Sequence, residues 1–142
     1  MKNTIESLVR DFTQAALPES VLSFIVSNSG EAFANHTFIV PHKSGDWDDS
    51  LENFYTEDEI IDTLERELML REGGAKDIPD GMIPVAENGL GDVIYISLRV
   101  HEVGALYYGF HEDMDLDSGS ESGLIHLAPN LFDWLKTLKN EN

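Results

Sequence analysis

Cysteine is absent from the 142 residues of this chain. Its absence excludes disulfide bonds, thiol catalysis and zinc sites built on cysteine, and it suits the reducing environment of the cytosol. Long apolar runs are absent too, and no stretch approaches the roughly 20 apolar residues that a membrane-spanning helix needs. Near the start of the chain, Glu6 interrupts the stretch where a secretory signal peptide would need unbroken apolar residues. We therefore expect a soluble protein of the cytoplasm without a membrane partner.

Positively charged residues are scarce. Nine Lys and Arg residues stand against 27 Asp and Glu residues, which gives a formal net charge of -18. Such a surface repels nucleic acid and anionic lipid, whereas it attracts cations and basic proteins. The acidic residues allow two interpretations. In the first interpretation they keep the protein soluble; in the second, the acidic surface binds a cationic partner protein such as a nuclease. We therefore expect no nucleic-acid partner, and the charge alone leaves these two interpretations open.

The rest of the composition is that of an ordinary globular protein. Hydrophobic residues make up 42% of the chain, which is enough for folding rather than disorder. A chain of this length buries a core without metals or disulfides. Because no internal repeat and no linker interrupts the sequence, we expect residues 1–142 to form a single domain.

The stretch from Gly81 to Glu112 predicts the centre of the fold. It consists of three apolar runs, and the turn between the first two carries Asn88-Gly89, a pair that tolerates positive φ in a tight hairpin. After this turn, residues 93–98 alternate with the period of two that is typical of a strand, and all three runs are rich in aromatic and β-branched residues. We therefore expect an antiparallel sheet in this part of the chain.

Four other segments have apolar residues at helical spacing, and two are strand-like. In the third helix, Thr56 and Glu59 form the Thr-x-x-Glu pattern of a capping box. We expect Val26 of the second helix and Met69 of the third to face inward. The predicted helices cover residues 2–14, 18–28, 56–72 and 130–138, and the additional predicted strands cover residues 33–40 and 124–127. This order predicts an α+β fold in which an antiparallel or mixed sheet is flanked by helices.

Two features resemble metal or catalytic sites but lack the complete pattern. The loop 113–121 carries carboxylates at alternate positions, as an EF-hand calcium loop does, but Leu124 stands where that loop needs a bidentate glutamate. The five histidines have no metal-binding spacing. His111 and Glu112 adjoin each other at the end of a predicted strand and would point to opposite faces, so we expect His111 to be a structural or interface residue. We predict no catalytic residue, no metal ligand and no cofactor.

The acidic residues are concentrated in the middle third of the chain, and they continue along the third helix to include Glu67. We expect residues 42–55 to form a polar loop around Trp47. An aromatic ring surrounded by acids is typical of a protein interface, because the ring supplies buried area and the acids steer a basic partner. In the alternative interpretation, Phe54 and Tyr55 dock this loop on the core. The predicted partner-binding residues are Asp46, Trp47, Asp48, Asp49, Glu52, Tyr55, Glu57 and Asp58.

Four blocks of residues follow one another in an order that is typical of one family. The blocks are Leu17-Pro18 with Asn28-Ser29-Gly30, then Ile83-Pro84-Val85-Ala86 with Gly91-Asp92-Val93-Ile94-Tyr95-Ile96, then Leu106-Tyr107-Tyr108 through His111-Glu112, and finally Leu127-Ala128 with Leu131-Phe132-Asp133-Trp134-Leu135. Together they resemble the SUKH superfamily, which includes the fungal Smi/Knr cell-wall regulators and many bacterial immunity proteins. Ser29 replaces a glycine of the family pattern, Pro129 and Asn130 depart from the last block, and the region 41–76 lies outside the resemblance.

The resemblance implies an α+β fold with helices around a sheet, and it transfers no catalytic residue. For bacterial members it implies binding and neutralising a polymorphic or contact-dependent toxin, often a nuclease. The first hypothesis is therefore a non-enzymatic immunity protein whose acidic surface blocks a basic cognate toxin. The second is a regulatory or scaffolding module of the Smi/Knr type, and the third is an enzyme or calcium-dependent protein that uses the loop 113–121. The sequence predicts no oligomeric state.

Overall fold

The structure is a computed structural model that describes residues 4–30 and 36–140. The helices are α1 (Ile5–Thr13), α2 (Glu19–Ser27), α3 (Glu57–Glu72) and α4 (Leu131–Thr137). The strands are β1 (His36–Val40), β2 (Trp47–Ser50), β3 (Asn53–Phe54), β4 (Met82–Glu87), β5 (Val93–Ser97), β6 (Leu106–Gly109), β7 (Leu124–Ala128) and β8 (Lys139–Asn140). Two 3-10 turns, η1 (His111–Asp113) and η2 (Leu116–Ser118), lie between β6 and β7. None of these helices is both long enough and apolar enough to cross a membrane.

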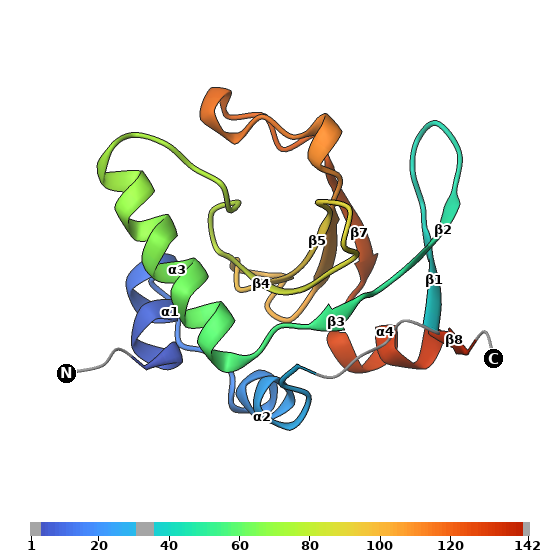
Figure 1. Cartoon of the computed structure of the whole chain (residues 1–142), viewed down its shortest axis with the longest axis horizontal. Helices are drawn as coiled ribbons and strands as arrows, with labels where there is room; N and C mark the ends of the chain where they lie inside the picture. The colour runs from blue at the N-terminus through green and yellow to red at the C-terminus, as the bar shows by residue number, and fades with distance from the viewer. Residues whose placement is uncertain (1–3, 31–35, 141–142) are drawn as a thin grey trace.

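The strands form two sheets. Strands β3, β4, β5, β6 and β7 lie side by side in that order, and β2, β1 and β8 form a smaller sheet. All of the described strand pairs are antiparallel. Figure 1 shows the β1–β2 hairpin at one side of the five-stranded sheet, α1 and α3 together at the other side, and α2 and α4 along the bottom. This arrangement confirms the predicted α+β fold with helices around an antiparallel sheet.

The turn between β4 and β5 forms where the Asn88-Gly89 pair predicts it. Gly89 and Gly91 have φ angles of +82° and +102°, a backbone conformation that residues with a side chain rarely adopt. The backbone N–H of Asn88 donates to the carbonyl oxygen of Asp92 at 3.1 Å and closes the turn. Asn88 and Asp92 are thereby held close to each other.

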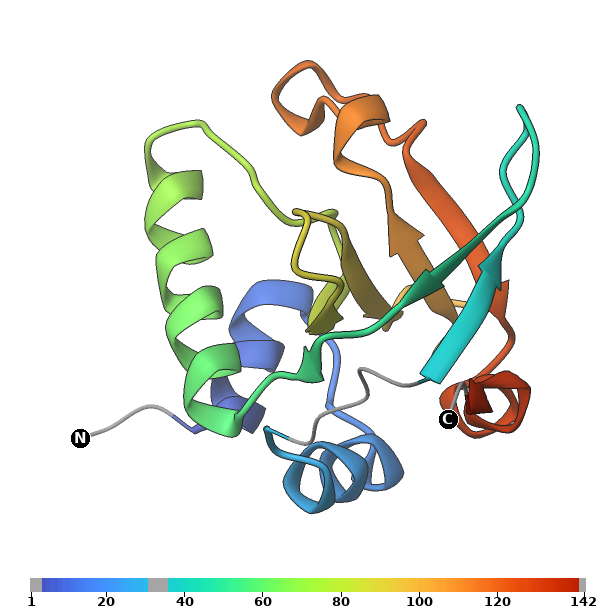
Figure 2. The same cartoon turned by 45° about the vertical axis from the view of Figure 1, so that its right-hand side comes forward.

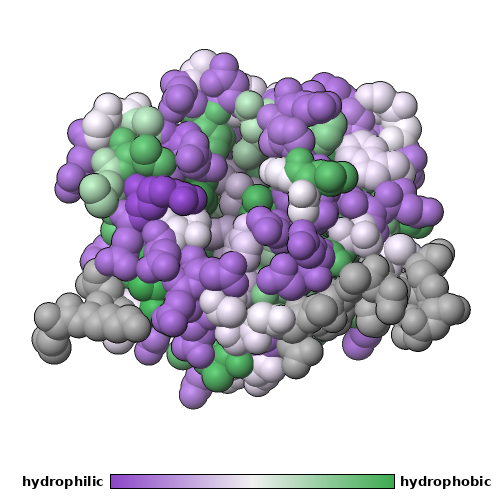
Figure 3. Space-filling view, in the orientation of Figure 1, coloured by the Kyte–Doolittle hydropathy of each residue, from purple (hydrophilic) through white to green (hydrophobic). Residues whose placement is uncertain are grey.

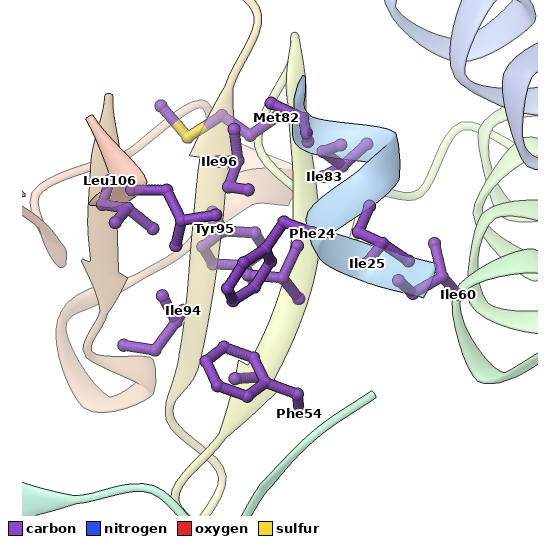
Figure 4. Close-up of a cluster of buried hydrophobic side chains, with 14 of the residues drawn as sticks. Phe24, Ile25, Phe54, Ile60, Met82, Ile83, Ile94, Tyr95, Ile96 and Leu106 are labelled. Carbon is purple, nitrogen blue, oxygen red and sulfur yellow. The ribbon is translucent and has the colours of Figure 1, made fainter. Parts of the chain in front are cut away.

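Apolar side chains of the sheet and of α2 form the core. Ile83 of β4 lies opposite Ile96 of β5, so both side chains are on one face of the sheet, and each is fully buried. Phe24 of α2 and Phe54 of β3 pack against each other within this core (Figure 4). Their ring centroids are 5.1 Å apart and their planes are inclined by 82°, the edge-to-face geometry that aromatic rings favour.

Two side chains that we expected to face inward lie at the surface. Val26 is 50% exposed and Met69 is 72% exposed. In α2 the buried stripe includes Phe24 in place of Val26, because the large ring reaches the sheet and fills the space there. In α3 the stripe of Ile60, Ile61 and Leu64 continues to Glu67 rather than to Met69.

Glu67 is a buried carboxylate and does not belong to the acidic surface in which the sequence placed it. The side chain is 1% exposed, and its oxygens accept the backbone N–H groups of Asp77 and Ile78 at 2.7 to 3.1 Å. Burial raises the pKa of Glu67, although these hydrogen bonds and nearby Arg71 oppose the rise. The carboxylate thus fixes the loop that follows α3 to the helix itself.

The segment predicted to be a polar loop, residues 42–55, contains two strands. The prediction is wrong for Trp47–Ser50, which pairs with β1, and for Asn53–Phe54, which pairs with β4. Acidic and polar residues have low strand propensity, but pairing with a formed neighbouring strand overrides such a preference. Residues 33–35, which began the preceding predicted strand, lie outside the described residues.

The capping box of α3 permits a test of helix stability. The hydroxyl oxygen of Thr56 accepts the N–H of Glu59 at 3.0 Å, and a carboxylate oxygen of Glu59 accepts the N–H of Thr56 at 3.0 Å. We expect Thr56→Ala to lower the free energy of unfolding by about 1 kcal/mol, because an N–H at the helix start loses its acceptor. Chemical denaturation followed by circular dichroism measures the change.

Thr63→Ala in the same helix is the matched control. The Thr63 hydroxyl donates to the carbonyl oxygen of Glu59 at 2.7 Å within the helix. Such back-bonding slightly disfavours a helix, and alanine has the higher helix propensity. We therefore expect Thr63→Ala to leave the stability unchanged or to raise it. Equal losses in the two variants would contradict a capping role for Thr56.

Candidate functional site

The acidic segment predicted to bind a partner forms an extended ridge. It runs from the β1–β2 hairpin along β3, the edge strand of the five-stranded sheet, to the N-terminus of α3 (Figure 1, Figure 2). Strand pairing fixes its backbone, since Asp48 lies opposite Ile39 and Asn53 lies opposite Glu87. Between the two strands, the N–H of Glu52 donates to the carbonyl oxygen of Glu87 at 3.0 Å. We call residues 46–58 the acidic ridge.

Trp47 is half-buried where the hairpin meets the five-stranded sheet. Its ring centroid lies 5.2 Å from that of His42, 5.9 Å from that of Tyr108 and 5.4 Å from that of Phe110. Phe54 is 2% exposed and belongs to the core. The rings of Trp47 and Phe54 thus attach the ridge to the body of the protein. The alternative interpretation predicted this role for Phe54 and Tyr55, but not for Trp47.

Asp49 joins the hairpin to the five-stranded sheet through hydrogen bonds. Its Oδ2 atom accepts from the Tyr108 hydroxyl at 2.5 Å and from the Asn88 side-chain amide at 2.9 Å. The same hydroxyl and the same amide lie 2.7 and 3.0 Å from Oδ2 of Asp92. One hydroxyl hydrogen and two amide hydrogens therefore serve two carboxylates, which would repel each other without these donors.

His111 binds the other oxygen of Asp92. The backbone N–H of His111 donates to Asp92 Oδ1 at 3.0 Å, and its Nδ1 atom lies 2.6 Å from the same oxygen. Burial raises the pKa of Asp92, but the hydrogen bonds from Tyr108, His111 and Asn88 outweigh burial and leave the pKa below 3.8. Because ionised Asp92 only accepts hydrogen bonds, Nδ1 of His111 carries the hydrogen. We call Asp49, Asn88, Asp92, Tyr108 and His111 the carboxylate network.

The sequence reasoning missed the carboxylate network. It placed His111 at the end of a strand, whereas β6 ends at Gly109 and His111 begins η1. The sequence offered one signal for this network: Asp92 and His111 both lie in blocks that resemble the family. No pattern in the sequence indicated that Asp49, distant along the chain, meets them.

Tyr55 and Glu52 border the β4–β5 hairpin. The Tyr55 hydroxyl donates to a carboxylate oxygen of Glu87 at 3.0 Å. Burial and the charge of Glu87 raise the pKa of this hydroxyl, which therefore stays protonated at neutral pH. Glu52 is exposed and lies against Gly89, where its carboxylate would collide with any added Cβ atom. The glycine thus permits a carboxylate to cover the turn.

Glu57 and Asp58 occupy the first turn of α3, where the helix dipole favours negative charge. The backbone N–H of Glu57 donates to the hydroxyl oxygen of Ser29 at 3.3 Å, so the ridge ends against the residues that follow α2. Glu57 is half-buried, whereas Asp58 is exposed.

The eight predicted partner-binding residues therefore divide into two groups. Trp47, Asp49, Tyr55 and Glu57 are half-buried, and the exposed ones are Asp46, Asp48, Glu52 and Asp58. Two exposed apolar side chains that we did not predict adjoin the ridge: Ile39, 52% exposed, lies opposite Asp48, and Leu90, 77% exposed, lies in the turn next to Gly89. Figure 3 shows a face that is mainly hydrophilic with separate hydrophobic patches. The sequence did contain a signal for the exposure of Leu90, because this apolar residue stands between two glycines of a turn, Gly89 and Gly91.

The carboxylates of the loop 113–121 point to different partners. Asp113 lies 3.1 Å from a ring nitrogen of His42, Asp117 accepts the N–H of Lys76 at 2.9 Å, and Glu121 pairs with Arg99 at 2.7 Å. Among the described residues, no three His, Asp or Glu side chains are grouped so that they could hold a metal ion.

Replacing Tyr108 with phenylalanine tests the carboxylate network. Tyr108→Phe removes the hydroxyl between Asp49 and Asp92, so we expect the free energy of unfolding at neutral pH to fall by about 1 to 3 kcal/mol. The lowered pKa of Asp92 stabilises the fold above the unfolded value of 3.8, and this contribution is lost as the pH falls through the folded value. The deficit of the variant should therefore shrink in acid. Urea unfolding at several pH values measures it.

Tyr95→Phe is the control for this substitution. Tyr95 lies in the neighbouring strand, is 5% exposed, and its hydroxyl makes no hydrogen bond to the residues that the structure describes. We expect this variant to keep its stability within about 0.5 kcal/mol. If Tyr108→Phe proved equally mild, or if its deficit grew in acid, the network would not hold the hairpin.

In a comparison with known protein families, one family model matches the part of the chain that contains both sites. A model of the SMI1 / KNR4 family (SUKH-1) matches residues 3–137, a range that includes the acidic ridge and the carboxylate network. No curated protein and no solved structure matches the chain. Gly91-Asp92 and His111, which carry part of the family resemblance, are in contact in the fold: the His111 ring lies over Gly91 and binds Asp92. Since the match spans most of the sequence, the chain belongs to the SMI1 / KNR4 family (SUKH-1).

Proposed function

We propose that the chain is a non-enzymatic immunity protein that neutralises a basic cognate toxin by binding it directly through the acidic ridge. The observation that carries this proposal is the exposure of Asp46, Asp48, Glu52 and Asp58 along one continuous segment of fixed backbone. A nuclease toxin fits this charge, since a protein that binds nucleic acid presents a basic surface.

A fixed ridge favours tight binding for two physical reasons. Its backbone is held by strand pairs and by the carboxylate network before the partner arrives, so little conformational entropy is lost on association. Exposed carboxylates raise the rate of encounter with a basic surface, and apolar side chains supply contact area once the surfaces meet. Ile39 and Leu90 are the apolar side chains available beside the ridge.

The contacts of the carboxylate network support the non-enzymatic part of the proposal. Asp49 and Asp92 are occupied by hydrogen bonds that attach the hairpin and order the β4–β5 turn. A general acid or base needs a proton that it exchanges with substrate near neutral pH. The low pKa of Asp92 suits a structural anion instead.

Membership of the SMI1 / KNR4 family favours a second candidate, a regulatory or scaffolding module without a toxin partner. Such a module would use the same ridge for a basic segment of a cellular protein. The two candidates differ in whether the chain protects a cell against a toxin.

A charge-reversal variant tests the ridge. We expect Asp46→Lys combined with Asp48→Lys, Glu52→Lys and Asp58→Lys to slow association with the toxin by about tenfold or more at low salt, because electrostatic steering is reversed locally. The control carries Asp11→Lys, Glu19→Lys, Asp62→Lys and Glu72→Lys, which are also exposed and change the net charge equally. Surface-based binding kinetics at two salt concentrations measure the rates. If both variants slowed association alike, the net charge and not the ridge would be responsible.

Protection is tested in living cells. If a toxin gene lies next to this chain's gene, that toxin is expressed with the wild-type chain, with the ridge variant or with the control variant. We expect growth with the wild type and the control, and reduced growth with the ridge variant. Absence of rescue together with absence of a complex at low salt would refute the immunity function and leave the regulatory module.

A further inference from the structure

A concave site lies over the five-stranded sheet, away from the acidic ridge. Its volume is about 320 Å³, and its floor is formed by Val93, Tyr95 and Gly109, which share one face of the paired strands β5 and β6. The loop after α3 and the loop containing η1 and η2 rise on either side (Figure 1, Figure 2). The N–H of Lys76 donates to Asp117 at 2.9 Å and connects the two loops.

Tyr95 brings an unused polar group to this pocket. The residue is 95% buried, since only 5% of it is exposed, and it lines the pocket. Its hydroxyl has no hydrogen-bond partner among the described residues, whereas the hydroxyls of Tyr55 and Tyr108 both bind carboxylates. The hydroxyl oxygen itself is not fully buried, so it is open to the pocket that Tyr95 lines. A polar ligand in the pocket would give the Tyr95 hydroxyl its partner.

His111 presents a second hydrogen-bonding group. Asp92 binds Nδ1 of the ring, so the remaining nitrogen, Nε2, is an acceptor in the neutral imidazole. The ring lines the pocket and lies over Gly91, whose φ angle of +102° is one that residues with a side chain rarely adopt. The carboxylate network therefore fixes the orientation of the His111 ring at the pocket wall.

The charges around the pocket select a cation. Asp77, Asp115 and Asp117 line it together with Lys76 and with His111, whose Nδ1 atom is bound to Asp92. The Lys76 ammonium group is already 3.3 Å from Asp80, which lies outside the pocket lining, so the carboxylates prevail. An anionic ligand would meet net repulsion here, and a neutral one would leave the negative potential uncompensated.

The shape and the acceptors favour a guanidinium group over an ammonium group. Val93, Met114 and Leu116 provide apolar contacts for an aliphatic stem, and the same lining includes three aspartates, His111 and Tyr95. Guanidinium offers five N–H donors in a planar fork, so it can bind several acceptors at once, whereas ammonium is a compact and strongly hydrated point charge. Gly109 leaves room for the Tyr95 ring, because a Cβ there would lie 2.6 Å from it.

We propose that this pocket receives the side chain of an arginine from the partner protein, with its guanidinium group between the Tyr95 hydroxyl, His111 and the aspartates of the two loops. The proposal deepens the proposed function, on which it rests for the identity of the ligand as part of a protein. The ridge steers the basic partner, and the pocket takes one anchoring side chain.

A titration of the free protein tests the pocket without the toxin. The probe is N-acetyl-arginine N-methylamide, and the matched control probe is the citrulline analogue, which replaces the guanidinium by an uncharged urea of the same shape. We expect saturable shifts of the backbone NMR signals of Gly91, Gly109 and His111 with the arginine probe, and weaker binding of the citrulline probe by about tenfold or more. Shifts that do not saturate, or that spread evenly over acidic surface residues, would overturn the proposal.

Variants separate a built site from general attraction. Tyr95→Phe deletes one hydroxyl, and Asp115→Asn removes one charge; each is expected to weaken the arginine probe by about tenfold. Asp62→Asn removes an exposed charge from α3 outside the pocket and should leave the affinity unchanged. Equal weakening by Asp115→Asn and Asp62→Asn would show that net charge alone attracts the probe, and the pocket would be refuted.

The two proposals fail in distinguishable ways. A toxin that binds the wild type while the arginine probe finds no site leaves the immunity function standing and removes the pocket. A probe that binds the pocket while no toxin is neutralised leaves the guanidinium site and removes the immunity function. If both stand, Tyr95→Phe should raise the dissociation rate of the toxin more than it lowers the association rate, because an anchor acts after encounter.

Discussion

The position of the β1–β2 hairpin depends on hydrogen bonds between two carboxylates, a phenol and an amide. Asp49 of the hairpin and Asp92 of the β4–β5 turn would repel each other, but the Tyr108 hydroxyl and the Asn88 amide lie within 3.0 Å of both. The hairpin's strand contact outside itself is the short pairing of β1 with β8. The carboxylate network and the rings around Trp47 therefore fix the position of the acidic ridge relative to the rest of the fold.

Local sequence patterns predicted the parts of the fold whose stability is local. Thr56 with Glu59 predicted the start of α3, and Asn88-Gly89 predicted a turn, because capping and positive φ depend on a few neighbouring residues. Strand β2 was missed because its formation depends on a partner strand and not on its own propensity. Glu67 was misplaced for a similar reason: its hydrogen-bond partners lie in a loop ten or more residues away.

The candidate site was only partly predictable because neighbouring acids have opposite fates. Asp48 and Asp49 are identical in type and adjacent in sequence, yet Asp48 is exposed and Asp49 is bound within the network. Successive side chains of a strand point to opposite faces, so a correct strand prediction would have separated them. Composition counts both as surface charge. Exposure, and not the number of acids, decides which carboxylates a partner meets.

Asp92 connects the two surfaces that we assign to a partner. Through Oδ2 it shares Tyr108 and Asn88 with the hairpin, and through Oδ1 it orients the His111 ring at the wall of the pocket. Both surfaces therefore rely on one buried anion whose hydrogen bonds outweigh the cost of burial. This arrangement gives a physical reason for the pairing of Gly-Asp with a later His in the blocks that resemble the family. The glycine allows the positive φ of the turn, and the aspartate holds the ring.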